Sequence, residues 1–198
     1  MSRAARTPPV IGVAGWKNSG KTTLVTRLIA ELTRRGLQVA SVKHAHYDFQ
    51  IDDADTDSAR HRRAGAAQVA IVSPRRWAVV RELRGAPEPS LDEMIGRLEP
   101  CDLVIVEGFK AAPIPKIEAR RLASARAVPL AATDPHVVAI AADHACDGAG
   151  RPVFALDDAE AIADFIVRIL GVGKGVRPSG SDTIALAPFR SWCQTQRV

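Results

Sequence analysis

The sequence predicts a three-layer α/β fold in which a mostly parallel central sheet is flanked by helices. Short runs of apolar, β-branched residues alternate along the chain with segments whose apolar residues recur at helical spacing. The first unit is a strand at 10–14, a helix at 22–34 and a strand at 37–42, and a helical crossover of this kind makes its two strands parallel. The apolar runs at 103–106 and 137–142 are expected to extend the same sheet.

Further strands are predicted from shorter patterns. Residues 68–73 form an apolar run that indicates another buried strand, and residues 77–80 indicate a short strand near a sheet edge. Apolar and charged residues alternate over 116–121, which is typical of a strand. A Gly/Pro turn precedes a last short strand at 153–156.

Local signals mark where several helices begin and end. Gly36 stands just after the first helix, at the position where a left-handed residue ends many helices. Ser90 and Glu93 have the spacing of a capping box at the start of a helix that ends before residue 100. Asp157 and Asp158 precede the apolar stripe of a final helix and are expected to cap it.

The stretch between the first strand and the first helix fits the phosphate-loop pattern G-x-x-x-x-G-K-[ST]. Glycines at both ends let the backbone curl, so that successive N–H groups point inward at the positive end of the helix and can hold the phosphates of a nucleotide. We expect Lys21 to reach the β- and γ-phosphates and the Thr22 hydroxyl to coordinate Mg²⁺. A P-loop NTPase-like fold follows, whose candidate loop residues are Gly15, Trp16, Lys17, Asn18, Ser19, Gly20, Lys21, Thr22 and Thr23.

A second motif closes the apolar run at 103–106 with the acid Glu107. This pattern resembles a Walker B strand, in which the carboxylate lies beside the Mg²⁺ of the bound nucleotide or orients a water. We therefore take Lys21 and Glu107 as catalytic candidates and Thr22 and Glu107 as candidates for holding the metal. The acid is a glutamate where an aspartate is usual, so direct and water-mediated contact both remain open.

Charged residues also follow the second strand, where the carboxyl ends of parallel strands face the ligand crevice. Lys43, His44 and His46 are expected to address phosphate or a partner, and the two histidines would bind a metal if further ligands converged on them. An acidic stretch at 52–58 then runs into bases at 60–63. One of its aspartates is a candidate for the Mg²⁺ site, although acids followed by bases also complement the dipole of an ordinary helix.

Composition and charge limit the functional class. The chain has 198 residues, of which 46% are hydrophobic and 25% charged, as in one soluble globular domain. The net charge of +5 is spread along the sequence, so we expect an anionic ligand such as a polyphosphate and no nucleic-acid partner. Three distant cysteines without C-x-x-C spacing indicate a reducing cytoplasm, and no apolar run approaches the length of a membrane span. We expect a nucleotide-binding domain at 1–170 and a flexible C-terminal extension at 171–198.

Four segments in this order and spacing resemble the MobB family of molybdopterin-guanine dinucleotide biosynthesis adaptor proteins. The resemblance spans about residues 9–142, and its segments are the phosphate loop, S-V-K-H-A-H at 41–46, D-T-D-S-A-R-H-R-R-A-G-A at 55–66, and D-L-V-I-V-E-G-F-K at 102–110 followed by P-K-I-E-A-R-R at 115–121.

The resemblance implies GTP and Mg²⁺ binding with weak hydrolysis, a homodimer, and a helper role in attaching GMP to molybdopterin. The nucleotidyl transfer itself would belong to a partner enzyme, MobA. By matching position, Lys43, His44 and Asp57 join the candidate nucleotide-binding residues. Related GTPases often carry a second lysine directly after the first glycine of the loop, whereas here Trp16 takes that place and Lys17 comes one residue later.

Two other functions stay open at this stage. A P-loop small-molecule kinase would use the same loop and the same acid. A metallochaperone-type GTPase would use His44 and His46 for its metal. The sequence has no clear N-K-x-D or T-K-x-D motif, so its residues do not separate guanine from adenine; the stretch 132–134 is a further candidate for contact with the base.

Overall fold

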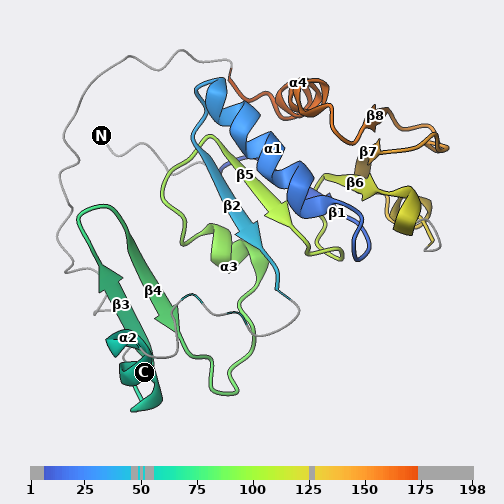
Figure 1. The fold of residues 1–198 in the computed structure, drawn as a ribbon. Coiled ribbons are helices and arrows are strands. Elements are labelled where there is room, and N and C mark those ends of the chain that lie inside the picture. The colour runs from blue at the N-terminus through green and yellow to red at the C-terminus, as the bar shows by residue number, and fades with distance from the viewer. Residues whose placement is uncertain (1–6, 46–48, 50, 52–55, 125–127, 174–198) are drawn as a thin grey trace.

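The computed structural model describes residues 7–45, 49, 51, 56–124 and 128–173, and these residues form an α/β fold around a six-stranded parallel sheet (Figure 1). Every neighbouring pair of strands in this sheet is parallel, which confirms the predicted sheet. In spatial order the strands are β2 (Val39–Lys43), β5 (Leu103–Glu107), β1 (Val10–Ala14), β6 (Lys116–Arg120), β7 (Val137–Ala142) and β8 (Val153–Ala155).

Helices cover both faces of the sheet and complete the three layers. Helices α1 (Lys21–Arg34) and α4 (Ala159–Leu170) pack on one face, where Leu28 and Ile166 are fully buried in the main core. Helix α3 (Leu91–Ile95) packs on the other face and buries Leu91 and Ile95 against β2 and β5. Among the described residues, no helix is long and apolar enough to span a bilayer.

The caps predicted from the sequence are present. The Ser90 hydroxyl accepts from the Glu93 backbone N–H and the Glu93 carboxylate accepts from the Ser90 N–H, which closes the capping box of α3. The Asp158 carboxylate accepts from the Ala161 N–H at the start of α4. Helix α1 ends before Gly36, whose φ of 85° is the left-handed conformation that suits glycine.

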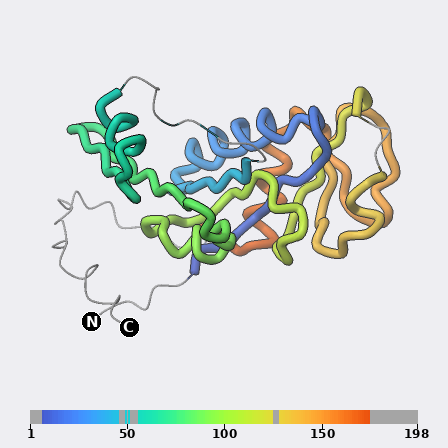
Figure 2. Tube along the Cα trace, turned by 90° about the horizontal axis from the view of Figure 1, so that it is seen from below, coloured from blue at the N-terminus to red at the C-terminus, as the bar shows by residue number. Residues whose placement is uncertain are grey.

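The prediction of a buried strand at 68–73 is wrong. Strand β3 (Gln68–Val72) pairs only with β4 (Trp77–Arg81), in a separate antiparallel hairpin that packs with helix α2 (Asp57–Arg63). Figures 1 and 2 both place this unit at the end of the molecule opposite β6–β8. The short turn between β3 and β4 pairs these two strands antiparallel. Of β3 only Val69 is buried.

Strand β6 is more deeply buried than its sequence pattern suggests. Alternation of apolar and charged residues is typical of a half-buried strand, yet Lys116 and Glu118 are each 1% exposed. Loops between strands supply partners for both charges. Lys116 Nζ lies 2.6 Å from Asp134 Oδ2 and donates to the Lys110 and Ala112 carbonyls, and Glu118 accepts from three N–H groups.

Candidate functional site

The phosphate loop joins β1 to α1 and takes a backbone path that glycine makes possible. Gly15 and Gly20 have φ of 153° and 89°, and Asn18 between them has φ of 64°. A Cβ on Gly15 would come within 2.4 Å of Ser19 Oγ and 2.6 Å of the Ala119 carbonyl oxygen, so a larger residue cannot fit without moving the backbone. The Ser19 side chain is buried in this curl, and among the described residues none forms a hydrogen bond with its hydroxyl.

Lys21 folds back over the loop that it is expected to serve. Its Nζ donates to the Trp16 carbonyl at 2.7 Å. Burial lowers the pKa of Lys21, and the nearby ammonium groups of Lys110 and Lys43 lower it further, against the opposing effect of Glu107. Three ammonium groups therefore surround one carboxylate, and this excess of positive charge favours an anion at the loop.

Strand register brings the expected metal-binding groups together. Glu107, at the end of β5, is opposite Val13 of β1 and Lys43 of β2. Its Oε1 accepts from the Thr22 hydroxyl at 2.6 Å and lies 3.5 Å from Lys43 Nζ. The structure thus places the Walker-B-like acid directly against the last residue of the phosphate-loop motif.

His44 lies just past Lys43 and is held by its surroundings. Its backbone N–H donates to the Glu107 carbonyl at 2.9 Å, its Nε2 is 3.0 Å from Glu88 Oε1, and its ring centroid is 4.8 Å from that of Phe109. The imidazole therefore faces the carboxylate of Glu88, which precedes α3, and the ring of Phe109, which follows β5. It lies at the same edge of the sheet as Glu107.

Within the described phosphate loop, the side chains of the other candidate residues form no hydrogen bond or ion pair with Glu107 or Lys21. Lys17, Asn18 and Thr23 are exposed on the loop and the first turn of α1. Trp16 is 38% exposed, its Nε1 donates to the Val128 carbonyl at 2.8 Å, and Lys110 Nζ lies 4.2 Å from its ring centroid.

The structure does not bring Asp57 to the phosphate loop. Asp57 begins α2, its carboxylate pairs with Arg60 at 3.3 Å, and both views place α2 at the far end from the loop (Figures 1 and 2). A nucleotide-binding role for Asp57 would therefore need a contact from outside this protomer. His46 and residues 52–55 lie outside the described part of the chain, within which no group of three or more His, Cys, Asp or Glu could hold a metal.

Residues 132–134, the candidate contact with the nucleotide base, lie beside the phosphate-loop site, but the carboxylate of Asp134 does not face it. Asp134 pairs with Lys116. Burial, the largest single influence, raises the pKa of Asp134, but the hydrogen bonds from Lys116 and from the His136 backbone N–H, together with the positive charge of Lys116, lower it overall. Ala131 and Ala132, by contrast, line a pocket next to the phosphate loop.

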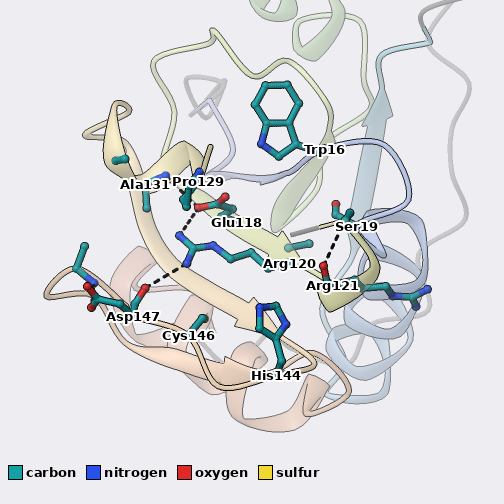
Figure 3. Close-up of a pocket in the computed structure, with 14 residues that line it drawn as sticks. Trp16, Ser19, Glu118, Arg120, Arg121, Pro129, Ala131, His144, Cys146 and Asp147 are labelled. Carbon is teal, nitrogen blue, oxygen red and sulfur yellow. Dashed lines mark hydrogen bonds and ion pairs between the residues drawn. The ribbon is translucent and has the colours of Figure 1, made fainter. Parts of the chain in front are cut away.

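This pocket is the part of the site that motif reasoning missed. It has a volume of about 330 Å³, lies at the carboxyl ends of β6 and β7, and includes Trp16 and Ser19 of the phosphate loop in its lining. Figure 3 shows Arg120 crossing the pocket, with Trp16 on one side and His144 and Cys146 on the other. A signal was available in the sequence, because Arg120 and Arg121 follow a strand that ends at this edge.

Comparisons with known proteins agree with the geometry. The family model for MobB, described as molybdopterin guanine dinucleotide synthesis protein B, matches residues 10–143. The molybdopterin-guanine dinucleotide biosynthesis adapter protein of Haemophilus influenzae is 38% identical over 172 residues, which cover 85% of this chain and 93% of the relative. The adapter protein of the same description from Escherichia coli is 35% identical over 161 residues, which cover 80% and 91%.

Solved structures give the same result. The crystal structure of molybdopterin-guanine biosynthesis protein B (mobB) has a TM-score of 0.62 at 32% identity and covers 81% of this chain and 99% of that one. The crystal structure of Bacillus subtilis MobB has a TM-score of 0.64 at 25% identity, with coverage of 82% and 98%. Since the family model spans more than half of the sequence and these relatives match over most of their length, the chain belongs to the MobB family.

Proposed function

We propose that this chain binds GTP with Mg²⁺ at the phosphate loop and acts as an adapter in the formation of molybdopterin-guanine dinucleotide. The observation that carries the proposal is the joint placement of Lys21, Thr22 and Glu107 at the end of β1. A nucleoside triphosphate and its metal require four kinds of group. Backbone N–H groups and a lysine hold the phosphates, and a hydroxyl and a carboxylate hold the metal. The chain's membership of the MobB family supports guanine as the base and an adapter role.

The oxygen ligands fit magnesium. Mg²⁺ prefers hydroxyl, carboxylate and phosphate oxygens, usually with only one or two protein ligands. Thr22 Oγ1 and Glu107 Oε1 lie 2.6 Å apart, so both would hold the ion, directly or through water, and the ion would neutralise charge on the phosphates.

We infer that hydrolysis is slow. The Glu107 carboxylate accepts from Thr22 and lies beside Lys43, which suits it to hold a metal rather than to take a proton from water. Lys21 stabilises phosphate charge and does not orient a water.

The adapter role needs a surface for a second anion and a partner. Lys43 lies beside Glu107 and is largely exposed, and Lys110 lies over the Trp16 ring of the phosphate loop. These cations suit the phosphate of molybdopterin, which a MobA-like nucleotidyltransferase would receive together with GTP. Arg62, a further cation in the segment at 55–66, pairs with Glu82 beside the hairpin.

We further propose that the protein is a homodimer joined through the β3–β4 hairpin. One face of the hairpin, which carries Val69, packs with α2. The opposite face presents Val72, Trp77 and Val79, which are 81%, 65% and 48% exposed. Apolar patches of this kind mark interaction sites, and an isologous contact would cover the same face on both copies. A cytoplasmic location fits the free thiols Cys101 and Cys146.

The proposal is tested by calorimetric titration with non-hydrolysable analogues of GTP and ATP in the presence of Mg²⁺. We expect GTP to bind at least about tenfold (about 1.4 kcal/mol) more tightly than ATP, and Lys21→Ala to abolish binding of both. Arg27→Ala, which removes an exposed cation from the outer side of α1, is the matched control and is expected to bind like the wild type. Preference for ATP would overturn the guanine assignment and favour a small-molecule kinase.

A further inference from the structure

The pocket adjoins the phosphate loop at the carboxyl ends of β6 and β7, the edge at which ligands bind in open parallel sheets. Glu118 of β6 is level with Ala14, the last residue of β1 before the loop. Arg120 follows two residues later, about 7 Å further toward the ligand edge, since strands rise about 3.3 Å per residue. Ser19 and Trp16 form the wall that the pocket shares with the loop, and its volume of about 330 Å³ suits a small-molecule site.

The guanidinium of Arg120 is fixed inside this pocket by two hydrogen bonds, neither of which uses its Nε–H. Nη2 donates to Glu118 Oε2 at 2.8 Å and Nη1 donates to the Asp147 carbonyl at 3.1 Å (Figure 3). Nε is buried, and no oxygen or nitrogen atom of the described residues accepts from it; the guanidinium instead contacts the thiol of Cys146, which is a weak acceptor. Glu118 cannot turn to Nε easily, because its two oxygens also accept the N–H groups of Leu130 and Ala131.

A second unpaired group lines the same wall. Ser19 is 2% exposed, and its hydroxyl also lacks a hydrogen-bond partner within the described part of the chain. Buried donors without partners are rare in proteins, because each has lost its hydrogen bond to water without gaining another. The Arg120 Nε–H and the Ser19 hydroxyl belong to the lining of one pocket, and together they indicate that a polar ligand supplies the missing hydrogen-bond acceptors.

We propose that this pocket takes the oxo-bearing edge of a guanine or pterin ring, with the Arg120 Nε–H donating to the ring oxygen. This inference rests on the proposed function, since the shared wall favours the guanine of GTP held at the loop. Guanine presents two acceptors, O6 and N7, to a guanidinium, whereas adenine presents a donor, its 6-amino group, in place of O6. A fixed donor therefore accepts guanine and opposes adenine, because adenine would leave two donors facing each other.

The floor of the pocket suits a flat ring. Ala119, Ala131 and Ala132 carry only methyl groups, so the ring can approach the backbone of β6 and the turn that follows it.

The test uses Arg120→Lys in the full chain. Lysine keeps the positive charge beside Glu118 but places a methylene where Nε–H stood. Calorimetry compares GTP, ITP and ATP analogues with Mg²⁺; ITP retains the 6-oxo group and lacks the 2-amino group. For the wild type we expect GTP and ITP to bind within about threefold of each other and ATP at least about tenfold more weakly. In Arg120→Lys, GTP and ITP should weaken to the level of ATP, whose binding changes little.

Controls separate the possible explanations. Arg27→Lys makes the same replacement on the exposed side of α1 and should keep the wild-type preference. Arg120→Met is a second variant in case the lysine donates from a new position. General loosening of the pocket would weaken all three nucleotides alike, so the ratio of GTP to ATP affinity reports the donor itself.

Free pterin is titrated in a parallel arm. If pterin binding falls in Arg120→Lys while the nucleotide preference stays, the pocket takes the pterin ring; if the nucleotide preference falls, it takes guanine. An unchanged preference with unchanged pterin binding would overturn this inference and leave GTP binding intact. ITP that binds as weakly as ATP would also overturn it, because the 2-amino group would then be the feature read. Failure of the wild type to bind any nucleotide would instead overturn the proposed function.

Discussion

Glu107 shows how one side chain connects the two motifs of the site. Its carboxylate is 11% exposed, accepts from Thr22 and lies beside Lys43, so three elements meet at one group. Each contact follows from strand order, because β5 lies between β1 and β2 and places its last residue beside both. The residue is thereby positioned before any metal arrives, which lowers the cost of organising the site.

Thr22→Val should separate metal binding from phosphate binding. Valine has the shape of threonine but lacks the hydroxyl that reaches Glu107, so we expect the gain in GTP affinity from Mg²⁺ to fall at least about tenfold. The free energy of unfolding should fall by only about 1 kcal/mol, since Lys43 still faces the carboxylate.

Titration with GTP in Mg²⁺ and in a chelator measures this effect, with urea unfolding for stability. Thr26→Val, one turn later on α1, loses only a hydroxyl bonded to the Thr22 carbonyl and should keep the wild-type metal dependence. An equal response of both variants to Mg²⁺ would show that Thr22 does not act on the metal.

At the scale of elements, the helices on one face are tied together by a charged cluster. Glu31 near the end of α1 pairs with Arg34 and Arg35, and Arg35 reaches across to Asp164 of α4. Hydrogen bonds from Arg34 and then Arg35 lower the pKa of Glu31 from 4.5 to about 2. The same helices carry the main core, so the cluster fixes their relative position over β1.

The Glu31 cluster predicts how stability depends on pH. The unfolded chain takes up a proton at this group near pH 4.5 and the folded chain only near pH 2, so the contribution of Glu31 is complete above pH 4.5 and is lost as the pH falls toward 2. Glu31→Gln should therefore flatten the fall of stability with acid in this window.

Urea unfolding between pH 2 and 6 tests this, with Glu99→Gln as the control at an exposed carboxylate. Added salt should reduce the difference, because the pairs are near the surface. Identical slopes for wild type and Glu31→Gln would contradict the assignment.

Some elements of this fold could be predicted from the sequence and others could not. The phosphate loop and the strand that ends in Glu107 were identifiable because motif, flanking strand and flanking helix agreed. The strand at 116–121 was also predicted, but its deep burial was not, since Asp134, Leu130 and Ala131, which pair with Lys116 and Glu118, come from loops 12 to 18 residues away in the sequence. The exposure of the β3–β4 hairpin and the pocket around Arg120 could not be predicted for the same reason. Tertiary contacts decide which residues are buried and which come together, and no local sequence pattern contains those contacts.

For the whole molecule, the structure separates two surfaces. The phosphate loop and its pocket lie at the carboxyl edge of the parallel sheet, whereas the hairpin and α2 stand at the other end (Figures 1 and 2). Nucleotide binding and assembly can therefore occupy different surfaces of one chain. The C-terminal extension expected at 171–198 lies almost wholly outside the described residues and stays a prediction.

Assembly through the hairpin is tested by its apolar face. Trp77→Lys together with Val79→Lys places charges where a second copy would pack, so sedimentation velocity should show a dimer for the wild type and a monomer for the variant. Val153→Lys, at a 43% exposed position on β8, is the control and should remain dimeric. A dimer that survives the double change, or one that Val153→Lys dissociates, would place the interface elsewhere.

The adapter role is tested most directly by reconstituting the attachment of GMP to molybdopterin by a MobA-like nucleotidyltransferase, with and without this protein. We predict that the wild-type chain raises the yield of molybdopterin-guanine dinucleotide at limiting GTP and that Lys21→Ala, which folds but lacks the phosphate-binding cation, does not. Equal yields without the protein, or equal stimulation by the wild type and Lys21→Ala, would contradict an adapter that works through its phosphate loop.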